Sequence, residues 1–293
     1  MNYCRTDLAC EIDLGRLMPE DGESVQDECG GVTVNRLCIK SEGLAARLGK
    51  PRGVYVTLGF DKVQTMSDET FEKLEEVLAR TLREMAERAT GKTVDDAFGV
   101  LVAGLGNEEI TPDAIGPMTV KRITVTRHVK RHYPSVYQAL KTCELSALVP
   151  GVLGQTGIET VELIRGAVEN VRPDLVVAVD ALVARSCDRL AATVQLSDTG
   201  LQPGSGIGNH RKAICRDTLG VPVISVGVPT VVNSATLVYD ALAQAGIEKP
   251  SEELLAVLEN GKSFFVSPKE SDLIVRQLST ILAGAVEAAF ATV

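Results

Sequence analysis

The chain has 293 residues, enough for one large domain or two small ones, and 45% of them are hydrophobic against 24% charged. Its net charge of −9 argues against general binding to nucleic acid or to a membrane surface. No apolar run is long enough to cross a bilayer, and the N-terminus lacks the apolar core of a secretory signal. Seven cysteines without a CxxC pair favour a reduced protein over a disulfide framework. We therefore expect a cytoplasmic globular enzyme or binding protein.

Short β-rich runs alternate with long helical patterns, and this order predicts an α/β fold. Residues 1–31 are polar and contain glycine, so we expect a loose N-terminal arm or pro-segment ahead of an α/β domain in residues 32–293. The predicted strands are Val32–Ile39, Val54–Phe60, Phe98–Ala103, Leu175–Val179, Ala192–Leu196 and Val221–Val226. The fully apolar runs suit central strands covered on both faces. The sequence thus predicts a single domain with a central mixed, largely parallel sheet flanked by helices.

Three helices have recognisable start signals. Ser67, followed by two acidic residues, predicts the start of a helix whose apolar repeat continues to Met85. Thr156 and Glu159 have the spacing of a capping box. Pro268 is expected at the first position of the last helix, because its missing N–H has no helical partner there.

Two aspartates follow the most apolar of the predicted strands. Asp113 lies in the loop after Phe98–Ala103, and Asp180 comes directly after Leu175–Val179. Either aspartate alone has an ordinary explanation as a cap or turn residue. Loops at the carboxyl ends of strands in open α/β sheets converge over one crevice, however, so the two should meet. Two crowded carboxylates have separated pKa values, which suits hydrolysis by one base and one acid.

Glycine-containing loops could bring backbone N–H groups close to a bound peptide or to an oxyanion. One loop contains Gly104, Gly106 and Asn107, and another contains Gly204 and Gly206. Neither has the glycine spacing of a dinucleotide fingerprint, and the sequence has no Walker A motif.

The tripeptide Asp198-Thr199-Gly200 matches the D-T-G signature of pepsin-like proteases. Those proteases need two copies on an all-β framework, whereas this sequence has one copy and strong helical patterns. A turn after the strand at Ala192–Leu196 is the favoured interpretation, and a supporting role of Asp198 in the site stays open.

The histidines do not form a recognisable metal site. His128 and His132 are four residues apart in a basic stretch, but no accompanying carboxylate signature such as HExxH is present. A solvated helix face is the favoured interpretation, and such a face could also attract an acidic substrate or a neighbouring subunit. His210, in a glycine loop, is expected to be a surface residue.

In this order the motifs resemble those of the germination proteases of spore-forming bacteria, endopeptidases that degrade small acid-soluble spore proteins. The matching blocks span nearly the whole chain: RTDLACE, GLGN…TPDAIGP, PGVLGQTGIET, DALVAR, DTGLQPGSGIGN, VPVISVGVPTVV and VSPKE. The segment between the last two blocks is shorter than is usual in that family.

The resemblance implies an aspartic peptidase unrelated to pepsin, similar in fold to the hydrogenase-maturation endopeptidases. It places the two functional aspartates at Asp113 and Asp180. It also implies a zymogen that trims its N-terminus, a homotetramer, a location in the cytoplasm of the spore core, and small acid-soluble spore proteins as substrates. No metal or organic cofactor is expected.

The resemblance also gives the N-terminal block a meaning. Family substrates are cut after an acidic residue and before a large apolar residue followed by alanine, with glutamate further on. Asp7, Leu8, Ala9 and Glu11 reproduce this pattern, which predicts self-processing between Asp7 and Leu8.

Three other functions stay open at this point. A hydrogenase-maturation-type endopeptidase would use its acidic residues to read a metal on a partner protein. A phosphorylase-like or nucleotide-binding protein would use the glycine loops. A non-catalytic oligomeric binding protein would need neither aspartate.

Overall fold

The computed structural model describes residues 6–12, 14–15, 17–204, 211–247, 251, 253–254 and 264–292. Strands in these ranges form one sheet: β1 (Gly22–Cys29), β2 (Val32–Ile39), β3 (Gly53–Gly59), β4 (Gly99–Gly104), β5 (Glu144–Leu148), β6 (Leu175–Ala184), β7 (Thr193–Ser197), β8 (Val223–Asn233) and β9 (Phe265–Val266). Their spatial order is β1-β2-β3-β7-β8-β6-β4-β5, and β9 pairs with β8.

The sheet has a parallel half and an antiparallel half. Strands β5, β4, β6 and β8 pair in parallel, whereas β1, β2, β3 and β7 pair antiparallel with one another and β7 pairs antiparallel with β8. The predicted α/β domain with a mixed sheet is confirmed. The parallel half contains the two strands that lead into Asp113 and Asp180.

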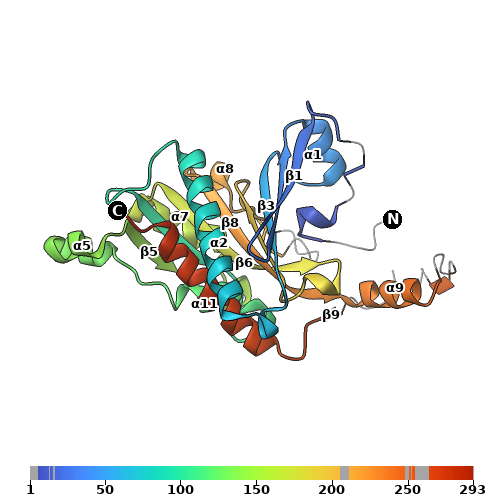
Figure 1. Ribbon diagram of the computed structural model, residues 1–293. Coiled ribbons are helices and arrows are strands. Elements are labelled where there is room, and N and C mark those ends of the chain that lie inside the picture. The colour runs from blue at the N-terminus through green and yellow to red at the C-terminus, as the bar shows by residue number, and fades with distance from the viewer. Residues whose placement is uncertain are drawn as a thin grey trace.

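Helices cover both faces of the parallel half (Figure 1). The helices are α1 (Glu42–Leu48), α2 (Asp68–Thr90), α3 (Ile115–Val120), α4 (Arg127–His132), α5 (Pro134–Leu140), α6 (Leu153–Thr156), α7 (Thr160–Val171), α8 (Arg216–Leu219), α9 (Ser234–Gln244) and α11 (Ser271–Ala289). No helix in the described ranges is both long and apolar enough to cross a membrane.

Alternate residues of β4 face opposite layers, as the strand period requires. Val100 and Val102 belong to the larger core, which α2 and α11 cover. Leu101 and Ala103 belong to a second core, which α7 covers. The prediction that this apolar run is a central strand covered on both faces is therefore confirmed.

The start signals of the helices had mixed outcomes. Ser67 caps α2, because its hydroxyl accepts a hydrogen bond from the backbone N–H of Thr70 at 3.2 Å. The predicted capping box was wrong: Thr156 ends α6 and its hydroxyl accepts the N–H of Ile158, while α7 begins at Thr160. Pro268 precedes the first turn of α11 instead of starting it.

The N-terminal residues differ from the loose arm that their polarity predicts. Gly22–Cys29 is strand β1, which pairs along its whole length with β2, so the predicted boundary at residue 31 falls within a hairpin. Residues 6–12 also pack against the sheet, and Leu8 is 0% exposed. Strand β1 lies at the edge of the sheet with mostly exposed side chains, so its sequence has no apolar period that could predict it.

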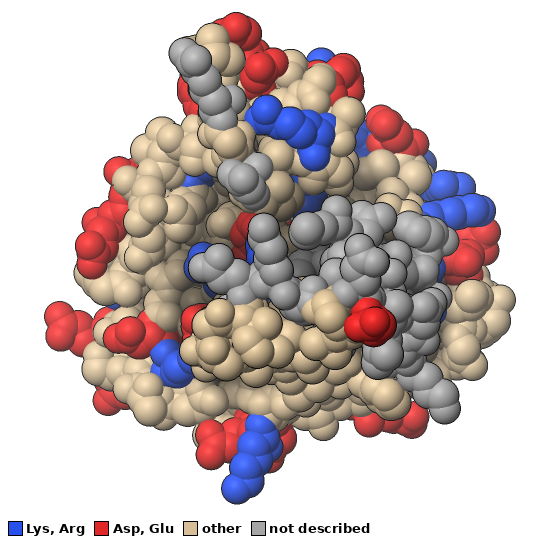
Figure 2. All heavy atoms as spheres, turned by 90° about the vertical axis from the view of Figure 1, so that its right-hand side faces the viewer, with Lys and Arg blue, Asp and Glu red and all other residues tan. Residues whose placement is uncertain are grey.

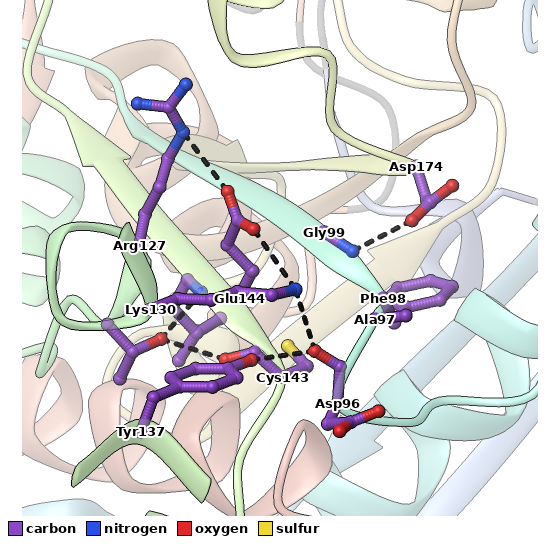
Figure 3. A network of polar contacts seen from close by, with 12 residues as sticks. Asp96, Ala97, Phe98, Gly99, Arg127, Lys130, Tyr137, Cys143, Glu144 and Asp174 are labelled. Atoms are coloured by element: carbon purple, nitrogen blue, oxygen red, sulfur yellow. Dashed lines mark hydrogen bonds and ion pairs between the residues drawn. The ribbon is translucent and has the colours of Figure 1, made fainter. Parts of the chain in front are cut away.

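A network of polar contacts fixes α4 and α5 at the N-terminal end of β4 and β5 (Figure 3). Glu144 lies between Arg127 at 3.1 Å and Lys130 at 3.2 Å. Lys130 and the Tyr137 hydroxyl both donate to the backbone carbonyl of Asp96. The basic stretch around His128 thus has a structural role, in which two of its cations contact one largely buried carboxylate.

Replacing Glu144 by glutamine is expected to lower the free energy of unfolding by about 1–2 kcal/mol, because two partly buried cations lose their counter-charge. Glu108→Gln is the matched control, since Glu108 contacts Lys121 with both side chains about half exposed. Its effect should stay within about 0.5 kcal/mol. Urea unfolding of both variants measures the difference, and equal midpoints would contradict the role given to Glu144.

Candidate active site

A cavity of about 980 Å³ lies beside the carboxyl ends of β4 and β6, and both Asp113 and Asp180 line it. The other charged residues of its wall include Asp7, Lys50 and Arg211. Figure 2 views the side of the molecule on which residues 6–12 and β9 lie in Figure 1, and this face is hollowed, with acidic and basic side chains in and around the hollow. The sequence prediction that the two aspartates meet agrees with this arrangement.

Asp113 is held by the loop that follows β4. It ends a short 3-10 helix, Thr111–Asp113, and its Oδ2 accepts the backbone N–H of Asn107 at 2.6 Å. The backbone N–H of Leu105 donates to the carbonyl of Val179 at 2.8 Å, which attaches the loop to β6. The Asn107 side chain in turn accepts from Gln155 at 2.9 Å. These bonds fix the Asp113 carboxylate relative to β6.

The glycines of this loop allow a close approach between two backbone segments. A Cβ on Gly106, whose φ is +110°, would lie 2.0 Å from the carbonyl oxygen of Asp113. A Cβ on Gly104 would lie 2.3 Å from the carbonyl oxygen of Gly116. Because the chain itself fills the space at both glycines, their demonstrable role is to position the Asp113 segment.

Asp180 lies inside β6 and not after its end. The strand continues to Ala184 because residues beyond Asp180 keep pairing with β8, with an irregularity between Leu182 and Val183. Asp180 is 8% exposed, and its Oδ1 accepts the backbone N–H of Ala181 at 2.9 Å. Its side chain therefore faces the cavity from a rigid central strand.

The surroundings of the two carboxyl groups affect their pKa values to different extents. Burial, and then the charge of Asp113, raise the pKa of Asp180 well above its ordinary value. Burial also raises the pKa of Asp113, while the Asn107 N–H and the Arg211 guanidinium oppose this rise. The arrangement therefore favours a protonated Asp180 beside an Asp113 whose ionised form has a hydrogen-bond donor.

Residues 6–11 lie along the second half of β6. The Asp7 N–H donates to the carbonyl of Val183 at 2.9 Å, and the Asp7 carboxylate accepts the N–H of Val183 at 2.9 Å. The Glu11 carboxylate accepts the N–H groups of Arg185 and Ser186, each at 2.8 Å. This segment is thus bound through both of its acidic side chains.

The side chain and carbonyl at the predicted cleavage point are also held. Leu8 packs in a buried cluster with Ala184, Leu190 and Val232. The carbonyl oxygen of Asp7 accepts hydrogen bonds from Lys50 Nζ at 2.9 Å and from Gln195 Nε2 at 3.0 Å. The peptide bond between Asp7 and Leu8 is therefore fixed at the wall of the cavity that contains both aspartates.

The remaining predicted residues have these positions. Asp198 forms a turn after β7, lines the cavity, and accepts the N–H of Val54 at 2.7 Å, so it joins β7 to β3. Gly204 also lines the cavity, whereas Gly206 and His210 lie outside the described residues. His128 and His132 lie on α4, and in the part of the chain that the structure describes no cluster of His, Cys, Asp or Glu could hold a metal ion.

Sequence reasoning did not single out several polar residues of the cavity wall, among them Lys50, Gln195 and Arg211. Gln195 is the one with a detectable signal, because it is a polar residue within the apolar run of a central strand. Lys50 follows a helix-ending glycine and has no motif around it. Arg211 lies next to a glycine loop, and its proximity to the aspartates depends on the fold.

Comparison with known proteins gives a family. The family described as "Germination protease" matches residues 19–246. A germination protease of Clostridium acetobutylicum is 37% identical over 322 residues, covering 99% of this chain and 95% of the relative. One from Caldanaerobacter subterraneus subsp. tengcongensis is 38% identical, with coverages of 95% and 91%. One from Priestia megaterium is 41% identical, with coverages of 86% and 72%. The resemblance drawn from the motifs is confirmed.

Proposed function

Because the chain belongs to the germination protease family, we propose that it is a self-processing endopeptidase that cuts after an acidic residue by means of Asp113 and Asp180. Its substrates are small acid-soluble spore proteins in the core of the germinating spore, and its precursor is a zymogen that cleaves itself after Asp7. Assembly as a homotetramer, which the family resemblance implies, belongs to the same proposal.

The observation that carries this proposal is the binding of residues 6–11 at the cavity. The segment has the residue pattern expected of a substrate, and each characteristic residue has a matching contact. The acidic residue before the bond accepts the Val183 N–H, the apolar residue after it fills a buried cluster, and Glu11 accepts two further N–H groups. These contacts are what a sequence-reading protease site requires.

The separated pKa values favour one assignment of roles. Asp113, as carboxylate, takes a proton from a water molecule whose oxygen attacks the carbonyl carbon of Asp7. Asp180, as carboxylic acid, gives its proton to the amide nitrogen of Leu8 as the carbon–nitrogen bond breaks. The products are a carboxylic acid at Asp7 and an amine at Leu8, and transfer of a proton from Asp113 to Asp180 restores the starting state of the site. Arg211 favours the ionised form of Asp113, the carboxylate that takes the proton, while burial keeps Asp180 protonated.

A peptide with the sequence of residues 6–11, flanked by a few polar residues, tests the activity in trans. We expect a single cut between its aspartate and leucine, mapped by mass spectrometry, and no cut when that aspartate is replaced by asparagine. Absence of any cut by the wild-type protein would contradict the proposal. Loss of cleavage on addition of EDTA would favour the metal-reading alternative, and thermal stabilisation by phosphate or nucleosides would favour the nucleotide-binding one.

A further inference from the structure

We propose that Lys50 and Gln195 are catalytic residues that form the oxyanion-binding site of this protease. The inference rests on the proposed function, because it takes the Asp7–Leu8 bond as the bond that is cut. Its basis is geometric: both side chains donate hydrogen bonds to the carbonyl oxygen of Asp7, at 2.9 Å and 3.0 Å. When water adds to this carbonyl, the negative charge of the intermediate develops on that oxygen.

The two donors are held by rigid parts of the fold. Lys50 follows Gly49, the left-handed residue that ends α1, and its own N–H donates to the carbonyl of Ala45. Gln195 lies in the middle of β7, paired with β3 on one side and β8 on the other. Donors fixed in this way need little reorganisation during the reaction, which is the condition for effective oxyanion stabilisation.

Gln195 contacts the peptide on both sides of the bond. Its Nε2 donates to the Asp7 carbonyl, and its Oε1 accepts the N–H of Ala9 at 2.6 Å. This pair of contacts fixes the carbonyl oxygen between Gln195 and Lys50. The same side chain therefore sets the register of the peptide and supplies an oxyanion donor.

Lys50 has the electrostatic environment that such a role needs. Burial lowers its pKa, and the nearby carboxylates of Asp7 and Glu11 oppose this effect. The Lys50 ammonium is partly buried and contacts a neutral carbonyl, so it gains most when the carbonyl oxygen becomes charged. This gain occurs in the transition state and not in the bound ground state, and only such a differential interaction accelerates the chemical step.

Self-processing of the full-length chain tests the assignment, because cleavage within one chain is first-order and its rate constant does not depend on protein concentration. Lys50→Met is expected to slow the appearance of the Leu8 N-terminus by about 10²–10³-fold, as for removal of an oxyanion donor, and Gln195→Met by about 10-fold or more. Lys50→Arg keeps the charge and should recover part of the rate. Arg47→Met is the matched control, since Arg47 donates to the carbonyl of Leu14, which lies beyond the bound segment of residues 6–11 and away from Asp7.

A second measurement separates catalysis from simple attachment of the N-terminal segment. Cys10 is half-buried in the bound segment, so its alkylation by iodoacetamide, mapped by mass spectrometry, reports whether the segment stays in place. Slow processing with unchanged Cys10 protection in Lys50→Met supports the oxyanion role. Slow processing with lost protection, or an unchanged rate, overturns it. A wild-type chain that does not cut itself overturns the proposed function, and this inference with it.

Discussion

The variant Asp180→Asn is expected to be more stable than the wild-type chain at pH 7 while its self-processing falls by about 10³-fold. The loss of rate follows from the removal of the proposed general acid, a type of group that contributes about 10²–10⁴-fold in comparable sites. The gain in stability follows from burial, since the folded state raises the pKa of Asp180 and so disfavours the charged form that dominates in the unfolded chain. A substitution that lowers the rate of processing but raises stability would indicate that Asp180 serves the reaction and not the stability of the fold.

The stability effect has a defined pH dependence. The unfolded pKa of an aspartate is about 3.9, and the folded pKa of Asp180 is higher. Between these two values the folded wild-type chain holds a proton that the unfolded chain has lost, so wild-type stability falls as pH rises through this window. The advantage of Asp180→Asn should therefore be absent below about pH 4 and grow above it.

Urea unfolding at several pH values, together with the rate of processing, measures both effects. Asp95→Asn is the matched control: Asp95 accepts the N–H groups of Ala97 and Phe98, and an asparagine oxygen can accept the same bonds. That variant should leave the rate of processing unchanged. Wild-type processing by Asp180→Asn would contradict the role assigned to this residue.

Gly106→Ala is expected to abolish processing and to lower the free energy of unfolding by about 3 kcal/mol or more. The added Cβ would lie 2.0 Å from the carbonyl oxygen of Asp113, at a backbone φ of +110° that alanine rarely adopts. Either the loop or the Asp113 segment has to move, and the hydrogen bond from Asn107 to Asp113 is lost with that movement.

Gly166→Ala provides the control for the same chemical change. Gly166 lies inside α7, and its added Cβ would meet nothing within 4 Å. Alanine favours a helix over glycine by about 0.5–1 kcal/mol, so this variant should gain stability and keep its activity. If Gly106→Ala behaved like Gly166→Ala, the close approach would not be what positions Asp113.

The sequence predicts the convergence of Asp113 and Asp180 because it depends on a general property of parallel sheets. Both residues follow apolar strands, and the carboxyl ends of neighbouring parallel strands lie at the same edge. The sequence does not predict that Asp180 lies within its strand, because the residues after it, ALVA, owe their strand conformation to pairing with β8. Local propensity has no information about that partner.

The contacts of the N-terminal segment are even harder to predict from the sequence than the position of Asp180 within its strand. Its cleavage pattern can be recognised, but its polar composition predicts a loose arm, whereas Leu8 is fully buried. Lys50 and Gln195 donate to the same carbonyl oxygen, although they are far apart in the sequence and strands β3 to β6 lie between them along the chain. Their meeting is a consequence of the strand order β3-β7-β8, which no local pattern encodes.

The most direct test of the central claim is the N-terminal sequence of the full-length chain after incubation at mildly acidic pH. We expect a new N-terminus at Leu8 in the wild-type protein and an unchanged Met1 in Asp113→Asn and Asp180→Asn, with both variants still folded by circular dichroism. A Leu8 N-terminus that appears in either variant at the wild-type rate would contradict the catalytic roles proposed for these two aspartates.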